Sequence, residues 1–248
     1  MTKVAVTAVE RVLDIIEAFR SARRPLSLTE LAELIGTPKS SCHAIVGTLV
    51  ARGYLYTLSR PRALYPTRRL HDLAREILQF DPFLERALPL LEKLRDDSHE
   101  TVIFGKRQAN AVVYLQVVPG PHSIRYSAAP GEIKPLHSSA IGKSILGSLK
   151  DNDLGKLLDE LPLPAVTGAT LVDKDALLED IVRSRKRGYY VTRGENVADV
   201  WAVAASLAIN GETLAVAVAG PRHRMQASVP ACANLLVATC SQLGRQAG

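Results

Sequence analysis

The pattern of apolar and polar positions between residues 26 and 55 predicts two short helices followed by a strand. Ser27 and Glu30 have the spacing of a capping box, in which each side chain bonds the backbone amide of the other residue. Apolar residues recur at helical spacing up to Ile35, and Gly36 is able to end a helix in a left-handed conformation. The first helix is therefore expected to be short.

A second helix is predicted to follow after a very tight turn. Thr37 is expected to be its N-cap and Pro38 its first residue, where a missing amide proton costs nothing. One face is apolar and is expected to pack on the preceding helix, with Cys42, Ile45, Val46, Leu49 and Val50. The other face carries small or hydrogen-bonding side chains, namely Lys39, Ser40, His43, Ala44 and Gly47. Such a face suits entry into a DNA major groove, where bulk would hold the helix away from the bases, although an ordinary solvated helix is the alternative.

The residues after the second helix predict a β-hairpin. The run 54–58 has the composition of a strand, 59–62 that of a turn, and 63–65 that of a returning strand. Arg60 and Arg62 would lie at the tip, within reach of a DNA phosphate or minor groove. A basic loop is also ordinary solvated surface. The hairpin has the position of the wing in a winged helix-turn-helix.

Helical patterns on both sides of this hairpin suggest how the chain is divided. Apolar positions between residues 9 and 19 predict a helix that completes a three-helix core. Residues 1–65 are therefore expected to form a winged helix-turn-helix domain, and the amphipathic pattern of residues 66–80 predicts a linker helix. Residues 81–248 are expected to form a second domain.

The second domain mixes helical and strand-like patterns, which predicts an α+β fold. Helices are expected at residues 82–97, 138–149, 151–160, 173–187 and 230–243. Strands are expected at residues 101–104, 111–118, 123–127, 189–192, 200–209 and 213–219. Asn210-Gly211 between the last two strands is a strong signal for a hairpin turn. An antiparallel sheet covered by helices is an architecture able to enclose a small molecule.

Positive charge gathers around the predicted helix-turn-helix. The chain has 31 Lys plus Arg and 25 Asp plus Glu, a net charge of +6. Residues 1–80 hold 12 basic and 7 acidic side chains, whereas residues 81–248 hold 19 and 18. Between Arg20 and Arg69 the count is nine basic against two acidic. A basic block beside a groove-sized helix is the electrostatic pattern expected of nucleic-acid binding.

Several other features narrow the location and exclude whole classes of protein. The three cysteines are Cys42, Cys232 and Cys240, which are too far apart for a C-x-x-C motif and are expected to be reduced thiols. The N-terminus lacks the apolar core of a signal peptide, and the longest apolar run, at residues 200–209, is too short to span a bilayer. We therefore expect a cytoplasmic protein with no membrane association.

An enzymatic function has little support in the sequence. Gly142-Lys143-Ser144 resembles the end of a phosphate-binding loop, but that motif needs a glycine where His137 stands. The six histidines are dispersed without metal-ligand spacing, and no G-x-S-x-G motif is present. No catalytic residue, metal site or cofactor is predicted. A DNA-associated enzyme or a winged-helix module for protein interaction remains the alternative to a regulator.

Motifs in both predicted domains resemble those of the IclR family of bacterial transcriptional regulators, and the likeness covers essentially all 248 residues. The N-terminal motifs are ERVLDII at 10–16 and the pattern running from LTELAE through PKSSCHAIVGTL to GYL at 53–55. The later motifs are PLHSSAIGKSIL at 135–146, GYYVTRGE at 188–195 and AVAVAGP at 215–221. The resemblance implies a GAF-like effector domain, a homodimer or homotetramer, and a small-molecule effector that alters operator binding.

The resemblance also implies where the effector binds. It places Ala140, Ile141, Thr192, Ala217 and Ala219 along the pocket. Family members that sense small organic acids carry an acidic residue at the position of Thr192 and serines at the positions of the last two alanines. Because too few hydrogen-bonding groups remain here to hold a very small polar acid, we expect a larger, partly apolar or aromatic ligand.

Ser123 and Arg125 are further candidates for ligand binding. They alternate on a predicted strand and so would share a face, which the resemblance directs toward the pocket. Arg125 could hold a carboxylate through two parallel hydrogen bonds. The alternative is that it pairs with an acidic side chain on the surface.

The predicted DNA-binding part departs from the family in its recognition helix and in the strand exit ALYPT at 63–67. Many members have an arginine after the histidine of the recognition helix, where this chain has Ala44. Wing and phosphate contacts are therefore expected to carry more of the affinity for a double-stranded operator. The residues predicted to contact DNA are Lys39, Ser40, Ser41 and His43 on the helix and Arg60 and Arg62 on the wing.

Overall fold

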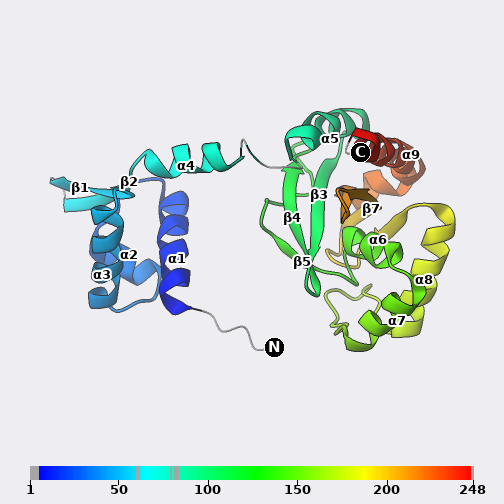
Figure 1. Cartoon of the computed structure of the whole chain (residues 1–248), viewed down its shortest axis with the longest axis horizontal. Coiled ribbons are helices and arrows are strands. Elements are labelled where there is room, and N and C mark those ends of the chain that lie inside the picture. Colours follow the sequence, from blue (N-terminus) through cyan, green and yellow to red (C-terminus); the bar gives the residue numbers. More distant parts are fainter. Residues whose placement is uncertain (1–5, 60–61, 79, 81–83, 247–248) are drawn as a thin grey trace. The chain divides into compact units, whose positions relative to one another are not determined.

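The computed structural model describes residues 6–59, 62–78, 80 and 84–246 (Figure 1). Packing divides the chain into two units, Met1–Asp81 and Pro82–Gly248. Each unit is described by itself below. The predicted wing residue Arg60 lies outside the described residues.

Unit one is a small helical domain with a two-stranded antiparallel sheet. Its elements in chain order are α1 (Thr7–Ala22), α2 (Leu28–Leu34), α3 (Lys39–Ala51), β1 (Leu55–Ser59), β2 (Arg62–Pro66) and α4 (Arg69–Leu78). The two strands pair from Leu55 opposite Pro66 to Ser59 opposite Arg62. A bridge between Leu26 and Leu64 ties the segment before α2 to the hairpin. The predicted winged helix-turn-helix is thus confirmed.

The start of α2 is fixed by the predicted capping box. The amide of Glu30 donates to the Ser27 hydroxyl at 3.2 Å, and the amide of Ser27 donates to the Glu30 carboxylate at 2.8 Å. Gly36 follows the helix with φ +60°. The prediction for Thr37 was wrong, because α3 has Pro38 as its N-cap and begins at Lys39. The Thr37 hydroxyl instead donates to the carbonyl of Ile35.

Replacing Ser27 by alanine should destabilise unit one by about 0.5–2 kcal/mol, because the amide of Glu30 loses its acceptor. Hydrogen bonds from the Ser27 amide and hydroxyl lower the pKa of Glu30 from 4.5 to about 2. The stabilisation that the charged carboxylate gives is therefore complete above pH 4.5 and is lost as the pH falls toward 2. Urea unfolding of the full chain at neutral and acidic pH measures both effects. Ser21→Ala, an exposed change on α1, is the control, and an equal loss there would contradict the prediction.

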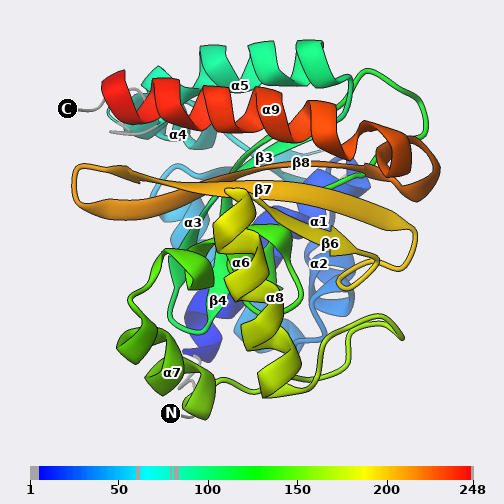
Figure 2. The same cartoon turned by 90° about the vertical axis from the view of Figure 1, so that its right-hand side faces the viewer.

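Unit two is built on one six-stranded antiparallel sheet with the order β5-β4-β3-β8-β7-β6. The strands are β3 (Thr101–Gln108), β4 (Ala111–Val118), β5 (Ile133–Pro135), β6 (Tyr190–Arg193), β7 (Val200–Ile209) and β8 (Glu212–Pro221). The helices are α5 (Leu84–Ser98), α6 (Ala140–Ser148), α7 (Asp151–Glu160), α8 (Lys174–Arg187) and α9 (Arg222–Gln246). Figure 2 shows α5 and α9 on one side of the sheet and α6, α7 and α8 on the other. The predicted α+β class is confirmed.

The strand alternation gives the two faces of the sheet different side chains. On β8 the residues Val216 and Val218 pack with α5 and α9, whereas Ala215, Ala217 and Ala219 pack with α6. Small side chains on the second face leave room beneath α6. The Asn210-Gly211 turn between β7 and β8 has positive φ at both residues, as the hairpin signal predicted.

Two predicted elements of unit two differ from the structure, and one observed strand was not predicted. The strand expected at 123–127 is absent, and this part of the chain is irregular. The short strand β5 was missed, because it has only three residues and ends in a proline. The last helix begins at Arg222 instead of Pro230, which lies inside it.

Two expectations about the whole chain concern thiols and membranes. The three cysteines are all buried and free, as expected for reduced thiols. Among the described residues, none of the helices has the length and apolar character that crossing a membrane requires.

Candidate nucleic-acid interface and effector cavity

The face of α3 that the sequence predicted to point outward is exposed in the structure. Cys42 and Val46 are buried in the core of unit one. Ser41 is half-buried, and the exposed residues of the helix include Lys39, Ser40, His43, Ala44 and Gly47. The exposed face is therefore narrow and contains few long side chains.

A groove brings this face together with the hairpin. It has a volume of about 590 Å³ and lies between α3, the start of α2 and the two strands. Lys39 and His43 line it from α3, Arg62 from β2, Thr29 from α2 and Thr57 from β1. Two cations and several hydroxyl or imidazole groups thus converge from four consecutive elements of unit one.

The basic residues of unit one differ in whether they have acidic partners. Arg20 and Arg24 pair with nearby glutamates, and Arg68 pairs with an aspartate. Within the described part of the chain, Lys39 and Arg62 have no acidic side chain within 4 Å. Their charge is not neutralised inside the protein, which leaves it available to a phosphate.

Unit two contains a second cavity, which is lined by α6, the sheet and two irregular segments. The five residues that the family resemblance placed along a pocket, Ala140, Ile141, Thr192, Ala217 and Ala219, all line it. Its volume is only about 30 Å³, which is enough for roughly two water molecules. The residues predicted to line a pocket thus lie around one cavity, which is too small for an organic ligand.

The polar groups that line the cavity are neutral. Tyr114, Tyr126, Thr192 and Asn196 contribute hydroxyl or amide groups, and no lining residue is charged. Burial raises the pKa of Tyr114, so its phenol stays protonated and can donate a hydrogen bond. The remaining polar residue, Ser139, is already used as the N-cap of α6, since its hydroxyl accepts from the Gly142 amide.

Ser123 and Arg125 are not among the lining residues. Both are exposed, and Arg125 donates to the carbonyl of His122 at 3.0 Å. The shared strand face predicted for them does not exist, because the segment is held by side chains and not by a strand ladder. The Thr101 hydroxyl donates to the Tyr126 carbonyl, which turns the Tyr126 ring into the cavity wall. Tyr126 was not predicted as a lining residue, because residues 123–127 were expected to form a strand with Ser123 and Arg125 facing the pocket.

A buried charged cluster lies behind the cavity floor. Lys143 of α6 is fully buried, and its ammonium group contacts the carboxylates of Asp180, at 2.9 Å, and Glu195. Burial raises the pKa of Glu195 although Lys143 acts in the opposite direction. Burial also lowers the pKa of His137, whose Nε2 contacts the Pro164 carbonyl at 2.9 Å. The Gly142-Lys143-Ser144 run lies in a buried helix and not in a phosphate-binding loop.

These features define the class of the protein. A winged helix-turn-helix with Lys39 and Arg62 on its exposed groove, joined to an α+β unit with a cavity between its sheet and α6, is typical of a transcription regulator with a separate sensor-like domain. Residues 76–245 match the family described as bacterial transcriptional regulator IclR C-terminal, and residues 8–59 match the IclR helix-turn-helix domain. The chain belongs to the IclR family of bacterial transcriptional regulators.

Curated relatives and solved structures agree with this assignment. The HTH-type transcriptional regulator BhcR of Paracoccus denitrificans is 34% identical over 224 residues, which cover 89% of this chain and 79% of that protein. The transcriptional repressor IclR of Escherichia coli is 29% identical over 225 residues, which cover 89% and 82%. The IclR of Thermotoga maritima has a similar fold, with a TM-score of 0.84 at 21% identity over 98% of this chain and 100% of that chain.

One solved structure of similar fold contains a small molecule. It is an IclR homolog from Microbacterium hydrocarbonoxydans complexed with 4-hydroxybenzoate, with a TM-score of 0.73. The identity is 21%, over 96% of this chain and 99% of that chain. This likeness establishes a shared fold.

Proposed function

We propose that the protein is a ligand-responsive regulator that binds a double-stranded operator as a homodimer or homotetramer. In this proposal a small, partly apolar or aromatic organic acid, or a related metabolite, binds in unit two and alters the affinity for DNA. The protein carries out no catalysis. The observation that supports this most strongly is the groove lined by Lys39, His43 and Arg62, none of which has an acidic partner among the described residues.

The proposed DNA contacts come from the recognition helix and the wing. Lys39, Ser40, Ser41 and His43 are proposed to enter the major groove, and Arg60 and Arg62 to contact the backbone or minor groove. Because α3 offers few long side chains, we assign much of the affinity to phosphate contacts. Such contacts give binding that weakens steeply with salt.

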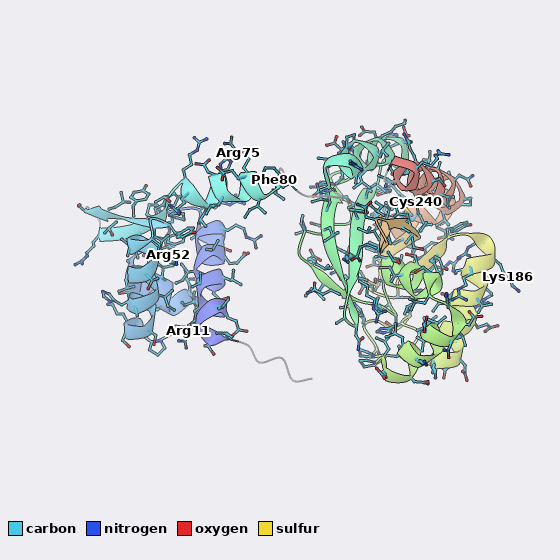
Figure 3. The ribbon with its side chains drawn as sticks, viewed as in Figure 1. Arg11, Arg52, Arg75, Phe80, Lys186 and Cys240 are labelled. Atoms are coloured by element: carbon cyan, nitrogen blue, oxygen red, sulfur yellow. The ribbon has the colours of Figure 1, made fainter. Side chains whose placement is uncertain are left out.

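Exposed apolar residues of unit one support self-association. Val9 and Leu13 of α1 are each 57% exposed, and Ile77 of α4 is 69% exposed. Phe80, which follows α4, is 84% exposed (Figure 3). Apolar surface of this kind commonly marks an interface, and a two-fold dimer would match a near-palindromic operator.

The proposed effector chemistry follows from the cavity lining. Tyrosine rings and small apolar side chains suit an aromatic ring, and the hydroxyls of Tyr114, Tyr126 and Thr192 can hydrogen-bond its polar substituents. A ligand of that size needs more than 30 Å³, so binding must enlarge the cavity. 4-Hydroxybenzoate, the molecule named with a solved relative of similar fold, is therefore a suitable first probe.

The test is binding to the promoter fragment beside the gene, measured over a series of salt concentrations. We expect a protected site whose affinity falls linearly on a logarithmic plot against salt. 4-Hydroxybenzoate and benzoate should shift this affinity, whereas a two-carbon keto acid should not. Flat salt dependence without a protected site would instead favour the alternative, a DNA-associated enzyme or a winged-helix module for protein interaction.

Replacing Ala217 by valine is expected to abolish the response to the effector, because the added methyl groups enter a cavity of about 30 Å³. Operator affinity without effector should stay within about twofold of the wild type, a change of roughly 0.4 kcal/mol. Titrations of the promoter fragment with and without 4-hydroxybenzoate measure both quantities. Ala208→Val, at an exposed position on β7, is the matched control. An unchanged effector response in Ala217→Val would exclude this cavity as the site.

A further inference from the structure

The outer wall of the cavity is an irregular segment between β6 and β7, residues 194–199. It contributes Asn196 and Val197 to the lining, and Val200, the first residue of β7, lies beside them. Val197 is 39% exposed, so this wall separates the cavity from solvent. The facing walls are buried residues of the sheet and of α6, which pack on one another in a single core. The cavity can therefore enlarge most easily by movement of residues 194–199.

This wall is joined to the rest of unit two through Gly194, Glu195 and Asp199, and the Asp199 carbonyl accepts from the Arg222 amide at 2.7 Å. The Thr167 hydroxyl donates to the Gly194 carbonyl at 2.6 Å, and the Thr170 hydroxyl donates to the Glu195 carbonyl at 2.7 Å. The Glu195 carboxylate forms an ion pair with Lys143. Lys143 lies one turn after Ala140 on α6, so the ion pair joins the wall of the cavity to its floor.

Lys143 has two carboxylate partners, which lie on elements of different kinds. Asp180 is fixed on the regular helix α8, whereas Glu195 lies on the irregular segment. Loss of the only partner of a buried ammonium group strongly destabilises the folded protein. Here Asp180, at 2.9 Å, would still compensate Lys143 after Glu195 moved away. Because of this second carboxylate, the Lys143–Glu195 pair can open without leaving a buried charge uncompensated and without unfolding the unit.

We propose that Lys143 and Glu195 are positioning residues, and that their ion pair holds residues 194–199 as a lid over the cavity. Opening the pair admits the effector, while Asp180 keeps Lys143 compensated. This inference rests on the proposed function, because the lid would control access of the effector to the cavity. Its test uses neither operator nor effector, so its failure is distinguishable from failure of the proposed function.

The first experiment is hydrogen exchange with mass spectrometry on the full chain, comparing wild type with Glu195→Gln. The amide side chain keeps the shape but removes the charge. We expect exchange in a peptide covering residues 193–201 to become about tenfold faster, with peptides of β3 and β8 unchanged. Glu212→Gln is the matched control, because Glu212 forms an exposed ion pair with Lys106 on the same sheet. It should leave residues 193–201 unchanged.

Two further variants separate a lid from general damage. Asp180→Asn removes the other carboxylate and should change exchange at residues 193–201 by less than twofold. Thr170→Val removes the hydroxyl bond to the Glu195 carbonyl without disturbing the buried charges, and should accelerate that exchange about threefold. This variant serves if Glu195→Gln does not fold. Unchanged exchange in the variants that fold, or equal acceleration throughout unit two, would overturn the proposal.

Access to the cavity itself is measured with a thiol. Ala219→Cys places one in the lining, where Ala219 is buried, and methyl methanethiosulfonate is a small reagent that labels it only when the cavity opens. We expect labelling to be at least fivefold faster when Glu195→Gln is added. The native thiols Cys232 and Cys240 are buried on the other face of the sheet and report general loosening. Equal labelling rates with and without Glu195→Gln would contradict the lid.

Discussion

Replacing Lys39 and Arg62 together by glutamine is expected to lower operator affinity about 100-fold, or roughly 1.4 kcal/mol for each residue. Both side chains line the groove between α3 and the hairpin, and neither has an acidic partner among the described residues. Their loss should also reduce the slope of affinity against salt by about one for each phosphate contact removed. Fluorescence anisotropy of the labelled promoter fragment at several salt concentrations measures both quantities.

The control for this experiment is a double substitution of equal charge change in unit two. Arg183 and Lys186 are exposed on α8, far in sequence from the helix-turn-helix, and Figure 3 shows Lys186 at the surface of that unit. Replacing both by glutamine should change operator affinity by less than about twofold, since only the general field of the protein is altered. Equal losses in the two double variants would mean that net charge, and not the groove, governs binding.

The DNA-reading half could be predicted from the sequence because its signals are local. Ser27 and Glu30 are three residues apart and satisfy each other's amides, so the start of α2 does not depend on distant parts of the chain. The one error concerned Thr37, where a hydroxyl beside a proline suggested an N-cap. The structure shows that the same hydroxyl bonds the end of the preceding helix instead. Both outcomes are local, and the sequence does not distinguish them.

The effector half was predictable only where a motif supplied the position. Residues such as Ala140 and Ala217 were identified by resemblance and do line the cavity. Arg125 was placed wrongly because strand propensity around it is outweighed by long-range bonds. The Thr101 hydroxyl and the Arg224 guanidinium hold the carbonyls of Tyr126 and Ile124, and both donors are remote in sequence. Such side-chain bonds have no periodic signal in the sequence.

The buried ion pairs of Lys143 were likewise not predictable from the sequence. In the sequence the lysine belongs to a Gly-Lys-Ser run that suggests phosphate binding, and an ordinary lysine is exposed. Its partners Asp180 and Glu195 come from a later helix and a later loop, and only folding brings them together. Only the three-dimensional arrangement therefore shows that this cluster joins the lid to α6.

Replacing Gly142 by alanine is expected to cost unit two about 3 kcal/mol or more. A Cβ at this position would lie 2.2 Å from the Leu136 carbonyl oxygen and 2.5 Å from its Cα. Both are backbone atoms of a buried residue, so relief requires α6 to move away from the segment before it. That movement would displace Ala140 and Ile141, the floor of the cavity. Urea unfolding of the full chain, followed by circular dichroism, measures the loss.

A second helical glycine provides the matched control. Gly155 lies within α7, and a Cβ there would have no heavy atom within 4 Å. Gly155→Ala is therefore expected to stabilise its helix by up to about 1 kcal/mol, because alanine restricts the unfolded chain and favours helix. The two substitutions add the same methyl group with opposite expected signs. If both stabilise the unit, α6 is not packed against Leu136 as closely as the structure shows, and the cavity floor is less rigid than the lid mechanism requires.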